Sequence, residues 1–377
     1  MTNRRNFIKQ ISAVGLAGCI PSAVSPAATI SGNHISAPAK PEDNPSGDKI
    51  WACWLHLSFN FASGINHPRW GNGIRTTFEP EQSVWDSAIN KMAEQKINMV
   101  VINLDDSVMW HSHPEIALIN SWTPERLREE LAKIRKLGIE PIPCLNFSTT
   151  HDAWMGKYSR MVSTQVYYQV CRDLIAEAIE IFDTPRFIHF GMDEETYYDN
   201  QQNFDYIVIR QDDHWWGDLY FYFAEAMMRG VRPWVWSDYM WNRPEWMISP
   251  AKSKEMFFKM MPKYVVQSNW YYGEEFDLKK LNDKEQKYVK AYIDLNAEGY
   301  DQIPTASNDA IMYGDKNNKK SIGNTVDFCS QNIDDKHLMG FLQSMWMPTI
   351  EKFSPNIMQT IELTGEARRK FESKNNN

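Results

Sequence analysis

Cysteine is scarce in this sequence, and its cysteines are far apart. The five are Cys19, Cys53, Cys144, Cys171 and Cys329. None forms a CxxC pair, and no cluster of histidines has the spacing of zinc ligands, which argues against a structural zinc site. We expect buried free thiols, although an oxidising compartment would permit a disulfide.

Three other features are missing. The formal net charge is −8 with acidic and basic residues interspersed, so no positive patch favours a nucleic acid or an anionic membrane surface. No apolar run reaches the roughly 20 residues that a membrane-spanning helix needs. No glycine-rich dinucleotide or phosphate loop follows the first predicted strand. These absences favour a neutral small molecule or polymer as the partner, with no transmembrane span and no cofactor.

The N-terminal segment is typical of an export signal. Arg4 and Arg5 form a twin-arginine pair, and the apolar run 11–20 that follows is too short to span a bilayer. Residues 1–28 are therefore predicted to be a twin-arginine export signal. Residues 29–48, rich in Ser, Pro, Ala and Asn, are predicted to be a flexible tether.

A second processing signal overlaps the first. Residues 16–19, Leu-Ala-Gly-Cys, resemble a bacterial lipobox, in which the cysteine is lipidated and becomes the new N-terminus. Simple cleavage near Ala27-Ala28 is the alternative. We expect a periplasmic protein or an outer-membrane lipoprotein of a bacterium, anchored in the second case through Cys19.

Short apolar runs alternate with amphipathic stretches throughout residues 49–377, which is typical of a parallel α/β fold. Eight runs are predicted to be strands: 51–59, 98–104, 140–145, 187–190, 233–236, 264–269, 302–307 and 339–346. Helices are predicted between them, among others at 85–96, 123–137, 164–182 and 215–229. Eight strand–helix repeats without an internal linker predict a single-domain (β/α)8 TIM barrel rather than an open, doubly wound sheet.

The fourth predicted strand, 187–190, runs directly into Asp193, Glu194 and Glu195. Reactive groups of such barrels lie at the C-terminal ends of the strands, so these acids stand where chemistry is expected. Adjacent ionised carboxylates repel, and one pKa usually rises until that group holds a proton near neutral pH. A protonated carboxyl is the general acid that cleavage of a glycosidic bond requires. The alternative is that these acids only cap a helix.

Aromatic residues are abundant and include 15 tryptophans. Sugars present apolar C–H faces that stack on aromatic rings while neighbouring polar groups bind their hydroxyls, so a tryptophan-rich cleft suits a carbohydrate. For any single tryptophan, packing in the core is the alternative. His111 and His113 form the one candidate metal motif, but they lack a third placed ligand, and we expect no metal ion.

Residues 189–194 read His-Phe-Gly-Met-Asp-Glu. This stretch is similar to the His-x-Gly-Gly-Asp-Glu signature of glycoside hydrolase family 20, the β-N-acetylhexosaminidases, with Met192 in place of the second glycine. Other stretches resemble the family in the same order, namely 85–106, 122–143, 234–238, 265–272 and 339–346. The likeness covers nearly the whole chain after the N-terminal segment, although only the Asp-Glu motif is specific.

The resemblance implies a retaining, substrate-assisted glycoside hydrolase with two catalytic residues. Glu194 would protonate the leaving oxygen, and the 2-acetamido oxygen of the substrate would attack the anomeric carbon. Asp193 would orient that acetamido group. The other residues expected to contact the sugar are Trp236, Trp270 and Trp346 as walls, Tyr271 or Tyr272 near the amide, and His189, Asp238, Asn269, Asn60, Asp106 and His151.

The chain departs from the family pattern at three strand ends. A Pro-Gly-His loop after the third strand is replaced by 144–151, in which only a displaced His151 could stand in. The substrate-binding arginine of the first strand is missing from 56–60, and Met347 and Pro348 replace an acid expected after Trp346. We therefore expect an exported hydrolase acting on N-acetylhexosamine-containing glycans. A carbohydrate-binding lipoprotein with an inactive barrel and a glycosidase of different sugar specificity are the alternatives.

Overall fold

The computed structural model describes residues 48–60, 66–67, 71–72, 74–195, 208–211, 213–242, 250–308 and 318–375. The predicted export signal, 1–28, with its lipobox cysteine Cys19, lies outside the described residues, as does the predicted tether apart from residue 48. Within the described part of the chain, no helix is both long and apolar enough to cross a membrane.

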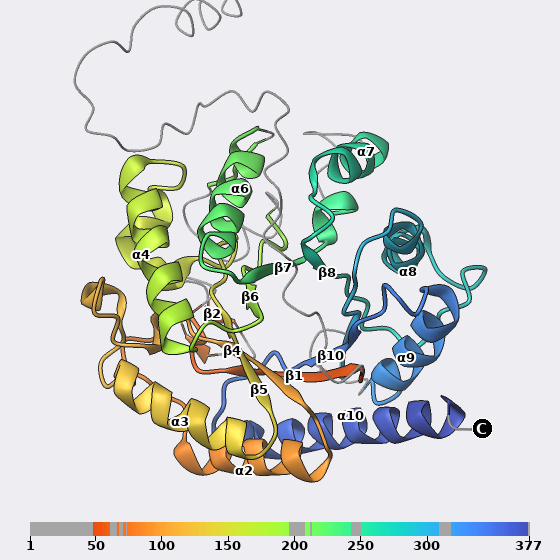
Figure 1. Cartoon of the computed structure of the whole chain (residues 1–377), viewed down its shortest axis with the longest axis horizontal. Coiled ribbons are helices and arrows are strands. Elements are labelled where there is room, and N and C mark those ends of the chain that lie inside the picture. The colour runs from red at the N-terminus through yellow and green to blue at the C-terminus, as the bar shows by residue number, and fades with distance from the viewer. Residues whose placement is uncertain are drawn as a thin grey trace, which may run out of the picture. The chain divides into compact units, whose positions relative to one another are not determined.

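Eight parallel strands form the central sheet (Figure 1). They are β1 (Ile50–His56), β4 (Met99–Asn103), β5 (Glu140–Cys144), β6 (Phe187–His189), β7 (Arg232–Trp236), β8 (Val266–Ser268), β9 (Thr305–Ser307) and β10 (Gly340–Ser344). Their spatial order is β8-β7-β6-β5-β4-β1-β10-β9. Parallel bridges from Gln267 to Gln302 and from Trp270 to Thr305 bring the two edges together. The predicted (β/α)8 barrel is confirmed.

Each predicted strand overlaps an observed one, although β1 and β7 begin one residue before the predicted start, at Ile50 and Arg232. β1 ends at His56, three residues before the predicted end, and β9 begins at Thr305, three residues after the predicted start. Gln302 instead forms isolated bridges, to Gln267 and to Leu338, on either side of it. The apolar run therefore marks a segment that spans the gap between β8 and β10, but only its second half pairs as a regular strand.

Helices surround the barrel (Figure 1). They are α2 (Gln82–Glu94), α3 (Pro124–Lys136), α4 (Gln165–Ile181), α6 (Asp213–Met227), α7 (Pro250–Met260), α8 (Asp283–Ala297), α9 (Ser321–Asn332) and α10 (Ser354–Asn375). α10 packs against α2, α9 and β1, so the last helix covers the first strand. Two short strands, β2 (Asn66–His67) and β3 (Gly71–Asn72), form an antiparallel hairpin.

The ends of α3 are determined by its own sequence. The hydroxyl of Thr123 accepts the backbone N–H of Arg126 at 3.2 Å and caps the N-terminus. Pro124 occupies the first turn, where a missing N–H costs nothing. Gly138 follows the helix with φ of 77°, a conformation that glycine adopts without strain. The predicted helix boundaries are confirmed.

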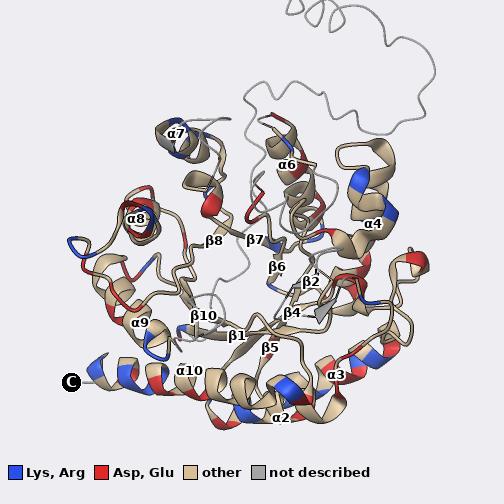
Figure 2. Cartoon of the chain, turned by 180° about the vertical axis from the view of Figure 1, so that it is seen from behind, with Lys and Arg blue, Asp and Glu red and all other residues tan. Residues whose placement is uncertain are grey.

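The hydrophobic core is rich in aromatic residues. The described tryptophans that are at most 3% exposed are Trp51, Trp54, Trp85, Trp110, Trp154, Trp215, Trp216, Trp234 and Trp236. Core packing therefore accounts for more of the tryptophan content than a sugar cleft does. The four cysteines of the barrel are buried free thiols, as predicted, and burial raises the pKa of Cys53 to about 12. Charged residues of both signs are interspersed along the outer helices α2, α3 and α10 (Figure 2).

Candidate active site

The predicted acids lie in a strained loop directly after β6. Gly191, Met192 and Glu194 have φ of 68°, 71° and 52°, all in the left-handed region that side chains disfavour. A Cβ on Gly191 would lie 1.9 Å from the side-chain oxygen of Asn146, so only glycine fits there. Strained backbone of this kind gathers at functional sites, where surrounding contacts hold it in place.

His151, from the loop after β5, lies between the two acids. Its Nε2 is 3.2 Å from Oδ2 of Asp193 and 3.3 Å from Oε2 of Glu194. The side chains of His151 and Asp193 are 9% and 11% exposed, whereas that of Glu194 is 29% exposed. Glu194 is thus the member of the group that a ligand can reach most easily.

The charges of His151 and Asp193 stabilise each other. Burial disfavours an imidazolium, but the charges and hydrogen bonds of Asp193 and Glu194 outweigh it and raise the pKa of His151 well above its ordinary value. Burial also favours the neutral form of Asp193, yet the charge and hydrogen bond of His151, with the amide of Asn146, lower its pKa. Asp193 is therefore ionised, and the proton expected on one of the two acids does not lie on it.

Three residues that the sequence analysis did not assign to the site hold the acids in place. The amide of Asn146 donates to Asp193 Oδ1 at 3.0 Å. The hydroxyl of Thr150 donates to the carbonyl of Glu194 at 2.7 Å. Asp105, at the end of β4, accepts the backbone N–H of Asn146 at 3.1 Å. Their only sequence signal was a position just beyond a predicted strand.

Asp238, at the end of β7, contacts the same loop. Its Oδ2 accepts the backbone N–H of Glu194 at 2.8 Å. Burial, and then the charge of Asp193, raise the pKa of Asp238 well above its ordinary value. The structure therefore brings Asp193, Glu194, His151 and Asp238 together from three adjacent strand ends.

Indole rings lie beside this group. The ring centroids of Trp54, Trp236 and Trp346 are 5.4, 5.7 and 6.0 Å apart. His189 packs against Trp236 with centroids 4.6 Å apart and against Trp54 at 5.1 Å. Trp54, a residue of β1, was not predicted as part of the site, because it stands in the middle of a strand rather than at its end.

His189 is a neutral ring in the barrel interior. Burial lowers its pKa to about 3. The backbone N–H of Gly191 donates to its Nδ1 at 3.0 Å, so the ring proton must lie on Nε2. His189 therefore holds the start of the loop after β6, residues 190–195, which carries Asp193 and Glu194 and is called the acid loop below.

The residues predicted after β8 form a second aromatic group. Trp270 stacks on Tyr272 with centroids 5.2 Å apart, and the indole N–H of Trp346 donates to the Tyr272 hydroxyl at 3.2 Å. Tyr271 packs edge-on against Phe276 at 5.2 Å. This group joins the wall formed by Trp236 and Trp346.

Asn269, by contrast, has both amide atoms bonded within the protein. Its oxygen accepts the indole N–H of Trp241 at 2.9 Å, and its nitrogen donates to the carbonyl of Tyr288 at 2.8 Å. Because these bonds use both amide atoms, Asn269 supports the aromatic group, and we do not assign it a contact with the ligand.

Asn60 and Asp106 form a third group, at the ends of β1 and β4. The amide of Asn60 donates to Asp106 Oδ2 at 2.7 Å, and the Ser58 hydroxyl donates to Oδ1 at 2.6 Å. Burial raises the pKa of Asp106 to about 6. Asp105, the neighbour of Asp106, accepts the backbone N–H of Asn146 and so links this group to the acid loop.

A metal ion is not needed to explain the central group. The ligand atoms of His151, Asp193 and Glu194 lie within 4.8 Å of one another, as they would around an ion. The His151 imidazolium already pairs with the Asp193 carboxylate and contacts the Glu194 carboxyl group, which accounts for the distances. His113 is also bracketed by acids, with Asp173 at 3.1 Å and Glu115 at 3.3 Å.

Comparison with solved structures gives the fold of this site. A glycoside hydrolase family 20 β-N-acetylglucosaminidase matches with a TM-score of 0.53 and 11% identity, over 83% of this chain and 69% of its own. A β-N-acetylhexosaminidase from Bacteroides fragilis matches with a TM-score of 0.53 and 11% identity, over 84% and 65%. A mutant Streptomyces plicatus β-hexosaminidase in complex with product (GlcNAc) matches with a TM-score of 0.55 and 13% identity, over 85% and 63%.

The barrel has a family 20-like fold. Because identity is 11 to 13% in these structures, the likeness is one of fold, and the chain spans only 63 to 69% of their length. No family model matches the sequence, and no curated protein matches it. The comparisons therefore show the fold alone, and the reaction must be argued from the site.

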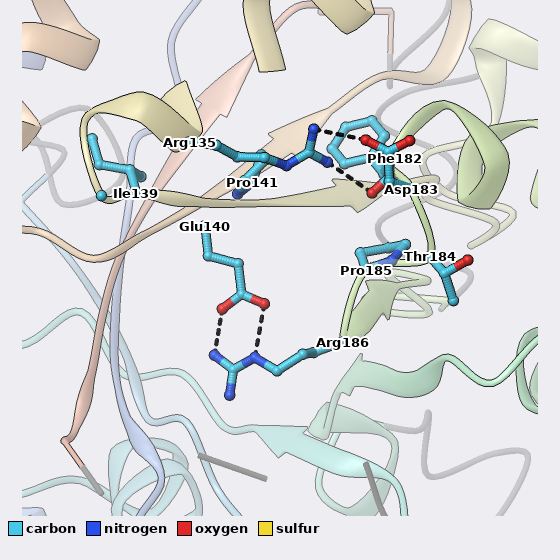
Figure 3. Close-up of a pocket in the computed structure, with 10 residues that line it drawn as sticks. Arg135, Ile139, Glu140, Pro141, Phe182, Asp183, Thr184, Pro185 and Arg186 are labelled. Atoms are coloured by element: carbon cyan, nitrogen blue, oxygen red, sulfur yellow. Dashed lines mark hydrogen bonds and ion pairs between the residues drawn. The ribbon is translucent and has the colours of Figure 1, made fainter. Parts of the chain in front are cut away.

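A cavity of about 400 Å³ lies away from the acids (Figure 3). It is lined by Arg135, Gly138, Ile139, Glu140, Pro141, Phe182, Asp183, Thr184, Pro185 and Arg186. Glu140 begins β5, so the cavity opens at the N-terminal face of the barrel, which in such folds serves stability. Its arginines are paired, Arg186 with Glu140 and Arg135 with Asp183, so we assign no chemistry to it.

Proposed function

We propose that this protein is an exported, retaining glycoside hydrolase that acts on N-acetylhexosamine-containing glycans by substrate assistance. The observation that carries the proposal is the position of His151, which contacts both Asp193 and Glu194 at the C-terminal mouth of a family 20-like barrel. One acid is thereby kept ionised, and the other lies next to it and is more exposed. An ionised carboxylate beside a second, more exposed carboxyl group is the pair that this chemistry needs.

In the first step Glu194 gives its proton to the glycosidic oxygen, and the bond from that oxygen to the anomeric carbon breaks. The carbonyl oxygen of the substrate's own 2-acetamido group forms a new bond to the same carbon from the other face. The ionised Asp193 accepts the amide N–H of that group and stabilises the positive charge that develops on it. No separate protein nucleophile is required.

In the second step the Glu194 carboxylate takes a proton from water, and the water oxygen attacks the anomeric carbon. The bond to the acetamido oxygen breaks, so two inversions give net retention. The His151 imidazolium lies beside Glu194 throughout and stabilises the carboxylate present between the steps. This contact is stronger once the proton has left, which is the condition for accelerating the reaction.

The aromatic wall supports a sugar as the ligand. Trp346 and Trp270 come from different strand ends of the same barrel face as the acids, and both contact Tyr272. Indole rings stack on the apolar faces of pyranose rings, and the hydroxyl of Tyr272 lies beside the indole of Trp346.

Export is supported by the Arg4-Arg5 pair and the short apolar run after it. Lipidation at Cys19 and cleavage near Ala27-Ala28 remain the two alternatives for processing. The mass of the mature N-terminal peptide distinguishes them, since only the first leaves a lipidated cysteine.

The test uses aryl glycosides with and without a 2-acetamido group. We expect the wild type to hydrolyse the N-acetylated substrates, and Glu194→Gln to reduce kcat by about 10²- to 10⁴-fold while sugar binding remains. Hydrolysis of substrates without the acetamido group would contradict substrate assistance and favour a glycosidase of another specificity. Sugar binding without turnover of any glycoside would favour a carbohydrate-binding lipoprotein.

A further inference from the structure

One buried acid next to Glu194 takes no part in these steps. Asp238 is 2% exposed. Its Oδ2 accepts the backbone N–H of Glu194 at 2.8 Å, and the amide of Asn242 reaches the same oxygen at 3.4 Å. Its Oδ1 is buried and has no hydrogen-bond partner among the described residues. A buried acid with one oxygen so occupied and the other unpaired calls for an explanation.

The bond from Glu194 to Asp238 fixes a strained residue. Glu194 has φ of 52°, in the left-handed region that side chains disfavour. A backbone N–H without an acceptor is costly in a buried loop, and Asp238 supplies that acceptor. The hydroxyl of Thr150 binds the carbonyl of Glu194 at 2.7 Å. Both peptide groups of Glu194 are thus held by side chains from neighbouring strand ends, which determines where its carboxyl points.

The surroundings of Asp238 oppose a negative charge. The titratable groups that face it are the carboxyl groups of Asp193 and Glu194, and Asn242 is neutral. His151, the cation of the group, is engaged with Asp193 and Glu194, and no ion pair of Asp238 occurs in the described part of the chain. Burial and the charge of Asp193 raise the pKa of Asp238 well above its ordinary value. Because Oδ2 accepts an N–H, the proton belongs on Oδ1.

We propose that Asp238 is a positioning residue that holds Glu194 in its working orientation, and that it does so as an uncharged carboxyl whose Oδ2 accepts the Glu194 N–H. This inference rests on the proposed function, since it takes Glu194 as the general acid. An uncharged carboxyl group at Asp238 favours the proposed reaction more than a carboxylate would. A third negative charge would oppose formation of the Glu194 carboxylate when its proton leaves.

The kinetic test compares Asp238→Asn with Asp238→Ala. The asparagine oxygen can still accept the Glu194 N–H without a charge, so we expect this variant to retain kcat to within about threefold, with an unchanged pH profile. Alanine leaves the N–H without its acceptor and should lower kcat by about tenfold or more with little change in KM. Asn242→Ala, which removes only the second donor to the same oxygen, is the matched control and should resemble the wild type.

A second measurement does not depend on activity. A carboxyl that stays protonated in the fold but ionises at an ordinary pKa when unfolded costs stability as the pH rises between those two values. Replacing Asp238 with Asn removes that cost. The melting temperature of Asp238→Asn minus that of the wild type should therefore be larger at pH 8 than at pH 5. Hydrogen exchange of the Glu194 peptide should be slow in the wild type and Asp238→Asn and faster in Asp238→Ala.

These measurements separate the two proposals. A wild type that hydrolyses no glycoside overturns the proposed function, while melting temperatures and hydrogen exchange still decide the state and contact of Asp238. If Asp238→Asn is as impaired as Asp238→Ala, or if its advantage in melting temperature is the same at both pH values, the uncharged-acceptor proposal is wrong. If Asp238→Ala does not fold, the comparison of wild type with Asp238→Asn decides alone.

Discussion

At the scale of single residues, the charge of His151 decides what its neighbours can do. Two carboxyl groups close together would ordinarily compete for a proton. Here the imidazolium contacts both, and the pKa of Asp193 falls below its ordinary value despite burial. The sequence indicates that the two acids are crowded. Their protonation also depends on His151, which the sequence shows only as a histidine displaced from the position that the family pattern predicts.

Replacing His151 with Gln tests this arrangement. We expect kcat to fall by about tenfold to a hundredfold, because the carboxylate formed at Glu194 loses its cation. The pKa of Asp193 should rise toward its ordinary value. Since Asp193 works in its ionised form, the acid-side fall in kcat should then occur at a higher pH than in the wild type. Rates on a chromogenic N-acetylhexosaminide across pH measure both effects.

His113 provides a matched control for that substitution. It also lies between two acids, 3.1 Å from Asp173 and 3.3 Å from Glu115, neither of which belongs to the loop after β6. His113→Gln should leave the pH profile in place. An acid limb that stays unmoved in His151→Gln, or moves equally in both variants, would contradict the role given to His151.

At the scale of elements, the loop after β6 owes its shape to contact with the loop after β5. Gly191 lies against Asn146, whose oxygen accepts the backbone N–H of Met192 at 3.3 Å and that of Ser148 at 3.0 Å. The same amide group donates to Asp193. One side chain thus fits the space that Gly191 leaves open and binds three positions across two strand ends.

Gly191→Ala should therefore destabilise the protein by more than backbone strain alone explains. A Cβ there would lie 1.9 Å from Asn146 Oδ1, and the residue has φ of 68°. Gly230, after α6, has φ of 76° with nothing within 4 Å of an added Cβ. We expect Gly230→Ala to lose about 1 kcal/mol and Gly191→Ala about 2 kcal/mol more, measured by urea unfolding. Equal losses would show that Asn146 moves aside freely.

The sequence predicts the elements better than the contacts between them. Apolar runs place all eight strands, because a strand buried on both faces is nearly continuous in hydrophobic residues. The acid pair is found because it follows a strand directly. Asn146, Asp105 and Trp54 are not found, since their roles depend on partners from neighbouring strands. No local pattern encodes which side chains of adjacent strand ends meet.

At the scale of the whole molecule, a buried ion network joins the acid loop to the helix layer. Arg210, 3% exposed, pairs with Glu195 at 2.8 Å and with Asp218 of α6 at 3.0 Å. It also donates to the carbonyl of Phe147 at 2.7 Å. One guanidinium therefore connects the residue after Glu194, the loop after β5 and an outer helix, so that the barrel mouth and α6 should lose their order together.

Arg210→Met should destabilise the fold by about 3–5 kcal/mol, because it leaves the carboxylates of Glu195 and Asp218 buried without their cation. Arg135→Met is the matched control. It breaks a pair with Asp183 whose side chains are 36% and 73% exposed, and such pairs contribute only about 0–1 kcal/mol. Urea unfolding measures both losses. Since the loss at Arg210 comes from uncompensated acids, adding Glu195→Gln should restore part of it, and a double variant no more stable than Arg210→Met would instead point to lost packing.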